Sequence, residues 1–383
     1  MFGGGEMAGL FVAFLASWLA TLLIVRYNHL HARFTADHDL NSVQKFHSRP
    51  TTRVGGVALM FGLCVAVVYA RFYLPYEIGQ EAGLLLLCAL PAFCGGVVED
   101  LTKRVGVLQR LALTAFSAAL GFWFLDAGLH DVDFPLLDLI MVFAPVSFLF
   151  TCFAVAGVAN SINLIDGYNG LASMVSAMIS GALAYVAYLV GDMLVWLGAL
   201  AMMGAILGFF LWNYPRGRIF LGDGGAYLIG FMIGELSVLL LVRNPQVSSW
   251  FPLLLVFYPV FETLFTIYRR VIVRKTSPGM PDAVHMHQMV YMRLVRWAVC
   301  SNCADERTMR NSMTAPYMWL LCSLSVVPAI LFWENETLLE FSVFGFALIY
   351  ILLYQSLARF RAPRFLVRKR PPLLMRRVRA ARK

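Results

Sequence analysis

Long apolar stretches alternate with short polar gaps along the whole chain, and this pattern predicts a helical membrane protein. Eleven stretches hold about 17 to 24 mostly apolar residues each, enough for a helix to cross ~30 Å of hydrocarbon. Alternation with a period of two residues is absent, which disfavours a transmembrane barrel. The expected spans are residues 7–25, 54–70, 82–98, 107–125, 136–159, 171–190, 193–212, 224–242, 250–268, 315–333 and 338–358.

The composition supports the same class. Hydrophobic residues make up 60% of the 383 positions and charged residues only 14%. A soluble domain of this size needs more polar surface than that. We therefore expect one all-α, polytopic transmembrane domain over residues 1–358, followed by a basic tail over 359–383. The loops expected on one side of the membrane are 26–53, 99–110, 160–170, 213–223 and 269–314.

The charge of the loops predicts the orientation in the membrane. Of the 31 Lys and Arg residues, 29 lie in these five loops and the tail, and only Arg71 and Arg243 lie in the other loops. The positive-inside bias therefore puts the five loops and the C-terminus in the cytoplasm and the N-terminus outside. The first apolar run lacks a basic segment before it, so we expect a retained helix rather than a cleaved signal peptide.

The basic tail dominates the formal net charge of +9. Residues 359–383 contain eleven Lys or Arg and no acid, which suits contact with anionic membrane lipid at about 1 kcal/mol per charge. Nucleic-acid binding is disfavoured, because no aromatic platform or nucleic-acid-binding fold accompanies the charge.

An acidic pair, Glu99 and Asp100, closes the third expected span, and Lys103 follows three residues later. Two adjacent acids at a membrane boundary repel each other unless a cation joins them. A divalent metal with oxygen ligands would meet that need. The alternative is a solvated helix end without a function.

A polar segment without basic residues follows the fifth expected span. If the helix of that span continues, Asn160 and Asn163 share a face and Asp166 extends it. Asn169 then lies in a turn between glycines. An Asn- and Gly-rich loop of ordinary kind is the alternative.

A third carboxylate, Asp223, lies among glycines just before the eighth expected span, after Phe220. The N-terminus of a helix presents free N–H groups that favour phosphate. Asp223 would hold the metal that the same phosphate binds. A simple acidic N-cap is the alternative.

Two histidines, His285 and His287, lie in the longest of these loops, where imidazole groups suit pyrophosphate, metal or proton transfer. Arg49 and Arg53 of the first loop form a basic cluster suited to anions. Two acids lie deeper within apolar runs. We expect Glu262 to border the site and Glu235 to meet a buried structural partner.

In this order, the segments Phe46–Gly56, Glu99–Lys103, Asn160–Leu171, Phe220–Gly225 and Asp282–Gln288 resemble the motifs of the polyprenyl-phosphate N-acetylhexosamine-1-phosphate transferases. The resemblance implies transfer of sugar-1-phosphate from a UDP-linked N-acetylhexosamine to undecaprenyl phosphate, with release of UMP. This reaction would be the first membrane step of a cell-envelope glycan such as O-antigen or a cell-wall polymer. It would take place at the cytoplasmic face of a bacterial inner membrane.

The resemblance also implies roles for individual residues. Mg²⁺, with Mn²⁺ as an alternative, would be held by Asp223 and Asp100. The expected catalytic residues are Glu99, Asp100, Asp166, His285 and His287. The expected substrate-binding residues are Arg49, Arg53, Lys103, Asn160, Asn163, Asn169 and Phe220, with Phe220 stacking on uracil. The chain departs from the family pattern at Glu99, where Asp is usual, and at Asn169, where a second acid is common.

Several alternatives stay open. A phospho-MurNAc-pentapeptide transferase is the nearest one, but that branch carries a further histidine, whereas this motif ends His285-Met286-His287-Gln288. A transporter of an anionic substrate is the alternative from another class. The sequence decides neither between a homodimer and a monomer nor between direct attack by the acceptor and a covalent intermediate. We favour direct attack, since the acceptor phosphate is already anionic.

Overall fold

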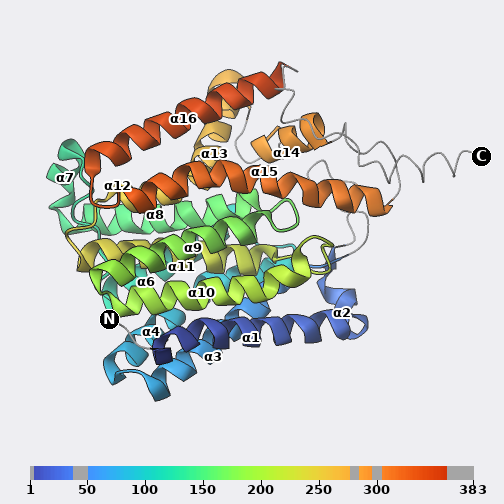
Figure 1. Cartoon of the computed structure of the whole chain (residues 1–383), viewed down its shortest axis with the longest axis horizontal. Coiled ribbons are helices and arrows are strands. Elements are labelled where there is room, and N and C mark those ends of the chain that lie inside the picture. The colour runs from blue at the N-terminus through green and yellow to red at the C-terminus, as the bar shows by residue number, and fades with distance from the viewer. Residues whose placement is uncertain (1–3, 38–50, 277–283, 296–303, 360–383) are drawn as a thin grey trace, which may run out of the picture.

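The chain folds as a bundle of long helices whose ends gather on two opposite faces (Figure 1). The computed structural model describes residues 4–37, 51–276, 284–295 and 304–359. Within these residues, ten segments are helical, long and apolar enough to cross a membrane. The chain is therefore an all-α, multi-pass membrane protein, in agreement with the hydropathy pattern.

The candidate spans consist of long helices and one pair of consecutive helices, α4 and α5. They are α1 (Gly4–Arg26), α3 (Gly55–Tyr73), α4 (Tyr76–Cys88) with α5 (Leu90–Thr102), α6 (Val107–Phe124), α8 (Ala144–Ile165), α9 (Leu171–Val190), α10 (Met193–Asn213), α11 (Gly222–Arg243), α15 (Ala304–Leu331) and α16 (Glu336–Ala358). The shorter elements are α2 (Asn28–Thr35), β1 (Ala36–Asp37), β2 (Thr51–Thr52), α7 (Pro135–Met141), α12 (Trp250–Leu255), α13 (Phe257–Tyr268), η1 (Arg269–Val273), α14 (Met286–Val290) and η2 (Tyr291–Val295).

The ninth expected span, residues 250–268, is broken into α12 and α13. Pro259 has no N–H to donate to the carbonyl of Leu255, four residues earlier, and α12 ends at Leu255. Neither half is long enough to count among the ten candidate spans. With these two halves taken together, each of the eleven expected apolar runs is mostly helical.

The fifth expected span, residues 136–159, was misplaced at both ends. Its start belongs to the separate helix α7, and α8 begins only at Ala144, with Pro145 in its first turn. At the other end α8 continues to Ile165, so Asn160 and Asn163 are helical. The expected loop 269–314 is likewise partly helical. Arg49 and the tail from residue 360 lie outside the described residues.

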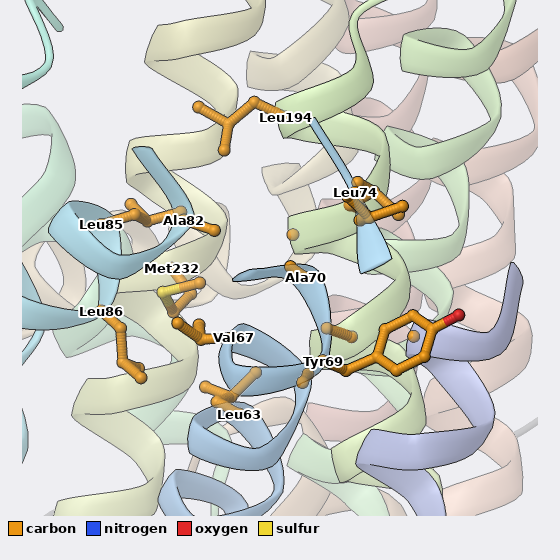
Figure 2. A pocket seen from close by; sticks show the side chains of 15 residues that line it. Leu63, Val67, Tyr69, Ala70, Leu74, Ala82, Leu85, Leu86, Leu194 and Met232 are labelled. Carbon is orange, nitrogen blue, oxygen red and sulfur yellow. The ribbon is translucent and has the colours of Figure 1, made fainter. Parts of the chain in front are cut away.

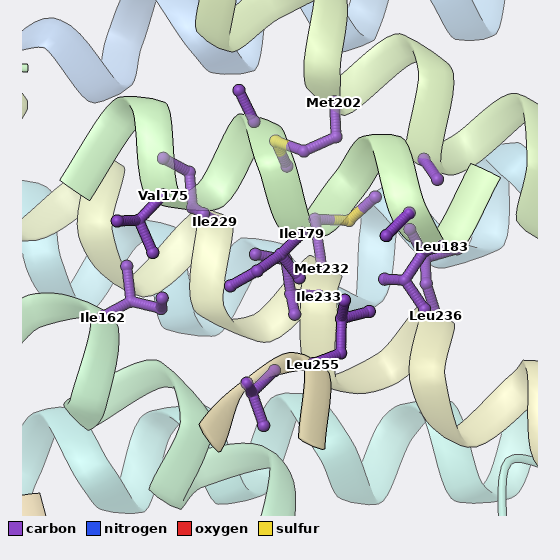
Figure 3. Packing of buried hydrophobic residues seen from close by; sticks show 14 of the residues in the cluster. Ile162, Val175, Ile179, Leu183, Met202, Ile229, Met232, Ile233, Leu236 and Leu255 are labelled. Atoms are coloured by element: carbon purple, nitrogen blue, oxygen red, sulfur yellow. The ribbon is translucent and has the colours of Figure 1, made fainter. Parts of the chain in front are cut away.

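The helix α11 forms the centre of the bundle. It is buried along its whole length from Gly222 to Leu240 and packs against α3, α5 and α8. Figure 3 shows how Ile229 and Ile233 of α11 meet Ile179 of α9 and Leu255 of α12. At the periphery, Phe11 of α1 is 59% exposed and faces the region that lipid fills.

Two glycines allow α11 to approach its neighbours at backbone contact. A Cβ atom at Gly56 of α3 would lie 2.3 Å from the backbone nitrogen of Gly225. A Cβ atom at Gly96 of α5 would lie 2.5 Å from the backbone of Gly224. Small residues permit such crossings between membrane helices. The crossing brings the ends of α3, α5 and α11 together on one face of the bundle.

A pocket lies between α1, α3, α4, α10 and α11, away from that crossing (Figure 2). Its lining is apolar and includes Leu63, Leu85, Leu194 and Met232. None of the predicted site residues lines it, so the chemistry must be sought elsewhere.

Candidate active site

A short backbone framework builds one wall of the site. The N–H of Phe220 donates to the carbonyl of Thr52 at 2.8 Å, and the N–H of Gly55 donates to the carbonyl of Phe220 at 3.0 Å. These bonds join the segment before α3 to the segment before α11. They fix Arg53 beside the first turn of α11.

Asp100 lies at the end of α5, is only 5% exposed, and holds the start of α11. Its carboxylate accepts the backbone N–H of Asp223 at 3.0 Å and that of Gly224 at 2.9 Å. Two of the N–H groups that we expected to be free at this helix N-terminus are therefore already bonded, because Asp100 supplies an anion there. These contacts support a positioning role for Asp100. Its role as a metal ligand stays a prediction.

Asp223 is the point where several elements meet. It forms an ion pair with Arg110 of α6, accepts the side-chain amide of Asn163 at 2.9 Å, and lies 3.6 Å from the guanidinium of Arg53. Arg53 also lies 3.8 Å from Asp100. Residues far apart in the sequence thus form one cluster, as the predicted motifs require.

Asp166 follows the last residue of α8, on the same face of the bundle. Its pKa is raised from 3.8 to about 7, chiefly because the carboxyl is shielded from water. Arg53 lowers the pKa, while the negative charges of Asp223 and Asp100 raise it further. Asp100, Asp166 and Asp223, called the acid cluster below, therefore lie close enough for their charges to act on one another.

The other residues of the Asn-rich segment have different surroundings. Asn169 is buried, and its side-chain amide donates to the carbonyl of Pro215 at 3.2 Å, while its backbone N–H donates to Asn311 at 2.8 Å. These bonds connect the turn before α9 to α15 and to the turn after α10. Asn160 is partly buried one helical turn before Asn163, and a contact with substrate stays a prediction for both Asn160 and Asn169.

Glu99 and Lys103 lie at the end of α5, near the cluster in sequence but with other contacts. The carboxylate of Glu99 accepts the N–H of Val105 at 2.7 Å and so caps the turn that follows the helix. Lys103 ends α5 in a left-handed backbone conformation with φ 57° and has an exposed side chain. Phe220 is partly buried at the wall described above. The substrate contacts expected for these three residues stay predictions.

The two histidines lie against the turn that carries Asp166. His287 is 2% exposed, stacks on His285 with 5.3 Å between ring centroids, and meets the ring of Tyr168 edge-on at 5.4 Å. A Cβ atom at Gly167 would lie 3.6 Å from Nε2 of His287. Burial lowers the pKa of His287 to about 3, so its ring is neutral at physiological pH. The segment around His285 and His287, called the histidine segment below, is therefore a neighbour of the acid cluster through Gly167.

Arg110 was not predicted as a site residue, since the sequence showed it only as one of the basic residues of the loop 99–110. It lies in the first turn of α6 and places its guanidinium over the ring of Tyr227 at 5.5 Å while pairing with Asp223. One signal was present, since an arginine at the start of an apolar run is expensive to bury without an anion. Nothing in the sequence indicated that Asp223 would be the anion.

Known proteins are similar in sequence to much of this chain. The sequence pattern described as glycosyl transferase family 4 matches residues 82–241. A probable undecaprenyl-phosphate N-acetylglucosaminyl 1-phosphate transferase of Bacillus subtilis is 28% identical over 290 residues, which are 74% of this chain and 77% of that protein. The undecaprenyl-phosphate alpha-N-acetylglucosaminyl 1-phosphate transferase of Escherichia coli K12 is 26% identical over 289 residues, with 72% and 75% covered.

The pattern match and these relatives identify glycosyl transferase family 4 as the family that this chain resembles. The family resemblance drawn from the ordered motifs is thereby confirmed, and the chain is a transferase rather than a transporter. A phospho-N-acetylmuramoyl-pentapeptide-transferase of Streptococcus pneumoniae is 30% identical over 223 residues, covering 56% of this chain and 65% of that protein. Both branches named in the sequence analysis are thus relatives of this transferase.

The acid cluster of the transferase fits a magnesium ion, although it is not a complete cage. Among the described residues, no group of three or more His, Cys, Asp and Glu side chains is arranged to hold a metal. Mg²⁺ needs no such cage, since proteins hold it by one or two carboxylates, with water and substrate phosphates as the other ligands. Asp223 and Asp166 supply carboxylate oxygens, and they lie close enough for the charge of Asp223 to act on Asp166.

Proposed function

We propose that this transferase moves sugar-1-phosphate from a UDP-linked N-acetylhexosamine to undecaprenyl phosphate and releases UMP. The observation that carries the proposal is the convergence of Asp100, Asp166 and Asp223 with Arg53 and Arg110 at one end of the bundle. Such a site suits a reaction that brings several phosphate charges together. The relatives named for N-acetylglucosaminyl 1-phosphate transfer support the donor and acceptor.

The transfer itself is a phosphoryl substitution. An oxygen of the acceptor phosphate attacks the phosphorus that carries the sugar, and the bond between that phosphorus and the oxygen of UMP breaks with its electron pair. The attacking oxygen of the acceptor phosphate is already anionic, so no proton has to be removed from it, and UMP leaves as the anion. We therefore favour direct attack over a covalent intermediate on an Asp.

We propose Mg²⁺, with Mn²⁺ as a substitute, as the cofactor, held by Asp223 with Asp166 or Asp100. The ion, when bound, neutralises charge on the donor pyrophosphate. Arg53 and Arg110 lie beside Asp223. Their positive charges would therefore lie beside the donor phosphates when the donor is bound there. Asn163 orients Asp223 through a hydrogen bond from its side-chain amide.

We propose that the site faces the cytoplasm at the inner membrane of a bacterium. The predicted loops and the basic tail, which together hold 29 of the 31 Lys and Arg residues, support this orientation. The site must lie at the membrane surface, because the phosphate of the acceptor lies there while its prenyl chain stays in hydrocarbon. Green fluorescent protein fused to the C-terminus should fluoresce in intact cells; a dark fusion together with an active periplasmic reporter would reverse the orientation.

The direct test is a donor panel. The purified full chain is incubated with undecaprenyl phosphate, Mg²⁺ and one UDP-sugar at a time, and the lipid product is weighed by mass spectrometry. We expect a lipid that carries N-acetylhexosamine-1-phosphate, with UDP-GlcNAc as the preferred donor. If only the UDP-MurNAc-pentapeptide donor gives product, the result favours the other branch. If none of the UDP-sugars gives product, the proposal is contradicted.

A further inference from the structure

A buried carboxylate outside the acid cluster holds the histidine segment in place. Glu262 of α13 is 1% exposed and lies within an otherwise mostly apolar helix. Burial of a charged group at such a place is costly unless donors surround it. Glu262 has these donors, and all of them come from the histidine segment and from α16.

The contacts of Glu262 converge on the start of α14. Its Oε1 accepts the backbone N–H of Met286 at 3.1 Å and lies 3.2 Å from Nδ1 of His285. Its Oε2 accepts the hydroxyl of Tyr350 from α16 at 2.7 Å. The groups that meet the carboxylate are therefore donors, so Glu262 acts as an acceptor through both oxygens.

This arrangement selects one form of the His285 ring. Nδ1 also lies 3.1 Å from the hydroxyl of Thr266. A carboxylate can only accept, so the hydrogen of the neutral ring belongs on Nδ1. Nε2 is then the ring nitrogen left for a substrate. Metal-ligating histidines are oriented by carboxylates in the same way.

A second tether from α16 holds the residue before His285. The hydroxyl of Tyr354 donates to the carbonyl of Val284 at 3.0 Å and accepts from Arg269 at 3.0 Å. Tyr350 and Tyr354 are four residues apart and therefore lie on one face of α16. The helix α16 thus holds the histidine segment directly through Tyr354 and indirectly through the bond of Tyr350 to Glu262.

Building on the proposed function, we propose that Glu262 and Tyr350 are positioning residues for the donor. They hold His285 and His287 against the turn that carries Asp166, with Nε2 of His285 directed to the donor phosphates. Neither residue touches the acid cluster, so their effect on transfer passes through the histidines. The same tether would keep the two imidazoles in place before the donor arrives.

The chain offers matched controls for both residues. Glu235 of α11 is also a fully buried glutamate, but neither of its oxygens has a hydrogen-bond partner in the described part of the chain. Tyr258 of α13 is a fully buried tyrosine whose hydroxyl likewise has no partner there. Glu235→Gln and Tyr258→Phe therefore make the same chemical changes without removing a bond to the histidine segment.

The first experiment measures the tether without any substrate. Amide hydrogen exchange of the full chain in detergent is followed by mass spectrometry over residues 284–291. We expect faster exchange in Glu262→Gln and Tyr350→Phe, and unchanged exchange in Glu235→Gln and Tyr258→Phe. Equal exchange in all five proteins, wild type included, would overturn the proposal, as would the same increase in the two controls.

The second experiment measures donor use with UDP-GlcNAc and undecaprenyl phosphate. We expect Tyr350→Phe to raise the donor KM about 3- to 10-fold with little change in kcat, and Glu262→Gln to lower kcat/KM about 10- to 100-fold. Glu262→Asp should recover part of the loss. Loss of kcat alone, with donor KM unchanged, would overturn the positioning role. A wild type that is inactive with every UDP-sugar would instead overturn the proposed function, while the exchange experiment still decides the tether.

Discussion

The carboxylate of Asp100 accepts the backbone N–H of Asp223 at 3.0 Å, although 123 residues separate the two acids in the chain. A second bond, from the N–H of Gly224, makes Asp100 the anion at the N-terminus of α11. The central helix of the bundle therefore begins on the carboxylate of one proposed site residue and presents the carboxylate of another. Both acids depend on each other for their geometry.

Asp100→Asn should weaken the fold and abolish transfer together. An amide has a single oxygen, so one of the two backbone N–H groups loses its acceptor, at a cost of about 1–3 kcal/mol. Thermal unfolding and UMP release measure the two effects. Asp138→Asn is the matched control, because Asp138 also accepts two backbone N–H groups, from Val132 and Phe134, at the opposite face. The control should lose stability and keep its activity; equal activity losses would contradict a special role for Asp100.

Arg110→Gln should reduce the Mg²⁺ concentration needed for half-maximal UMP release. Arg110 pairs with Asp223 and therefore competes with a cation for the same carboxylate. We expect a decrease of several-fold, since one unit charge is removed from a poorly solvated pair. Arg104→Gln, an exposed arginine of the same loop, serves as the control. An unchanged Mg²⁺ dependence in Arg110→Gln would show that the ion does not replace Arg110 at Asp223.

Asn169→Asp restores the acid that is common in the family signature, and it should destabilise this chain. The side-chain amide of Asn169 donates to the carbonyl of Pro215, and an ionised carboxylate would face that oxygen with another acceptor. An unsatisfied buried group of this kind costs about 1–3 kcal/mol. Thermal unfolding at pH 8 is the measurement. An unchanged unfolding temperature would mean that the hydrogen bond from the side chain of Asn169 contributes nothing to stability.

The contribution of Asp166 to the free energy of unfolding should fall as pH rises from about 4 to about 7. Its folded-state pKa is raised to about 7, so the folded state binds the proton more tightly than the unfolded state does. Stability decreases with pH in that window, because the unfolded state binds fewer protons there. Unfolding temperatures of wild type and Asp166→Asn across this range test the prediction. The difference between the two proteins should shrink as pH falls, and a constant difference would contradict it.

Much of the fold could be predicted because hydrocarbon imposes long apolar helices, and α9 (Leu171–Val190) begins and ends where the pattern placed it. Boundaries failed where proline interrupts the helical hydrogen bonds, as at Pro259. The acids of the site were recognisable from their motifs. The partner of Asp223 was not, because Arg110 acts through a contact between distant helices that spacing along the chain does not encode. Glu262 was expected at the border of the site, but its bonds to the histidine segment were not predicted.

The central claim is that Asp223 belongs to one divalent-cation site at which UMP is released. The most direct measurement is UMP release from UDP-GlcNAc and undecaprenyl phosphate by the purified chain during a Mg²⁺ titration, with wild type and Asp223→Asn side by side. We predict saturable, Mg²⁺-dependent release in wild type and at least a ~100-fold lower rate in Asp223→Asn at every Mg²⁺ concentration. Release that persists in excess EDTA, or an equal rate in Asp223→Asn, would contradict the account.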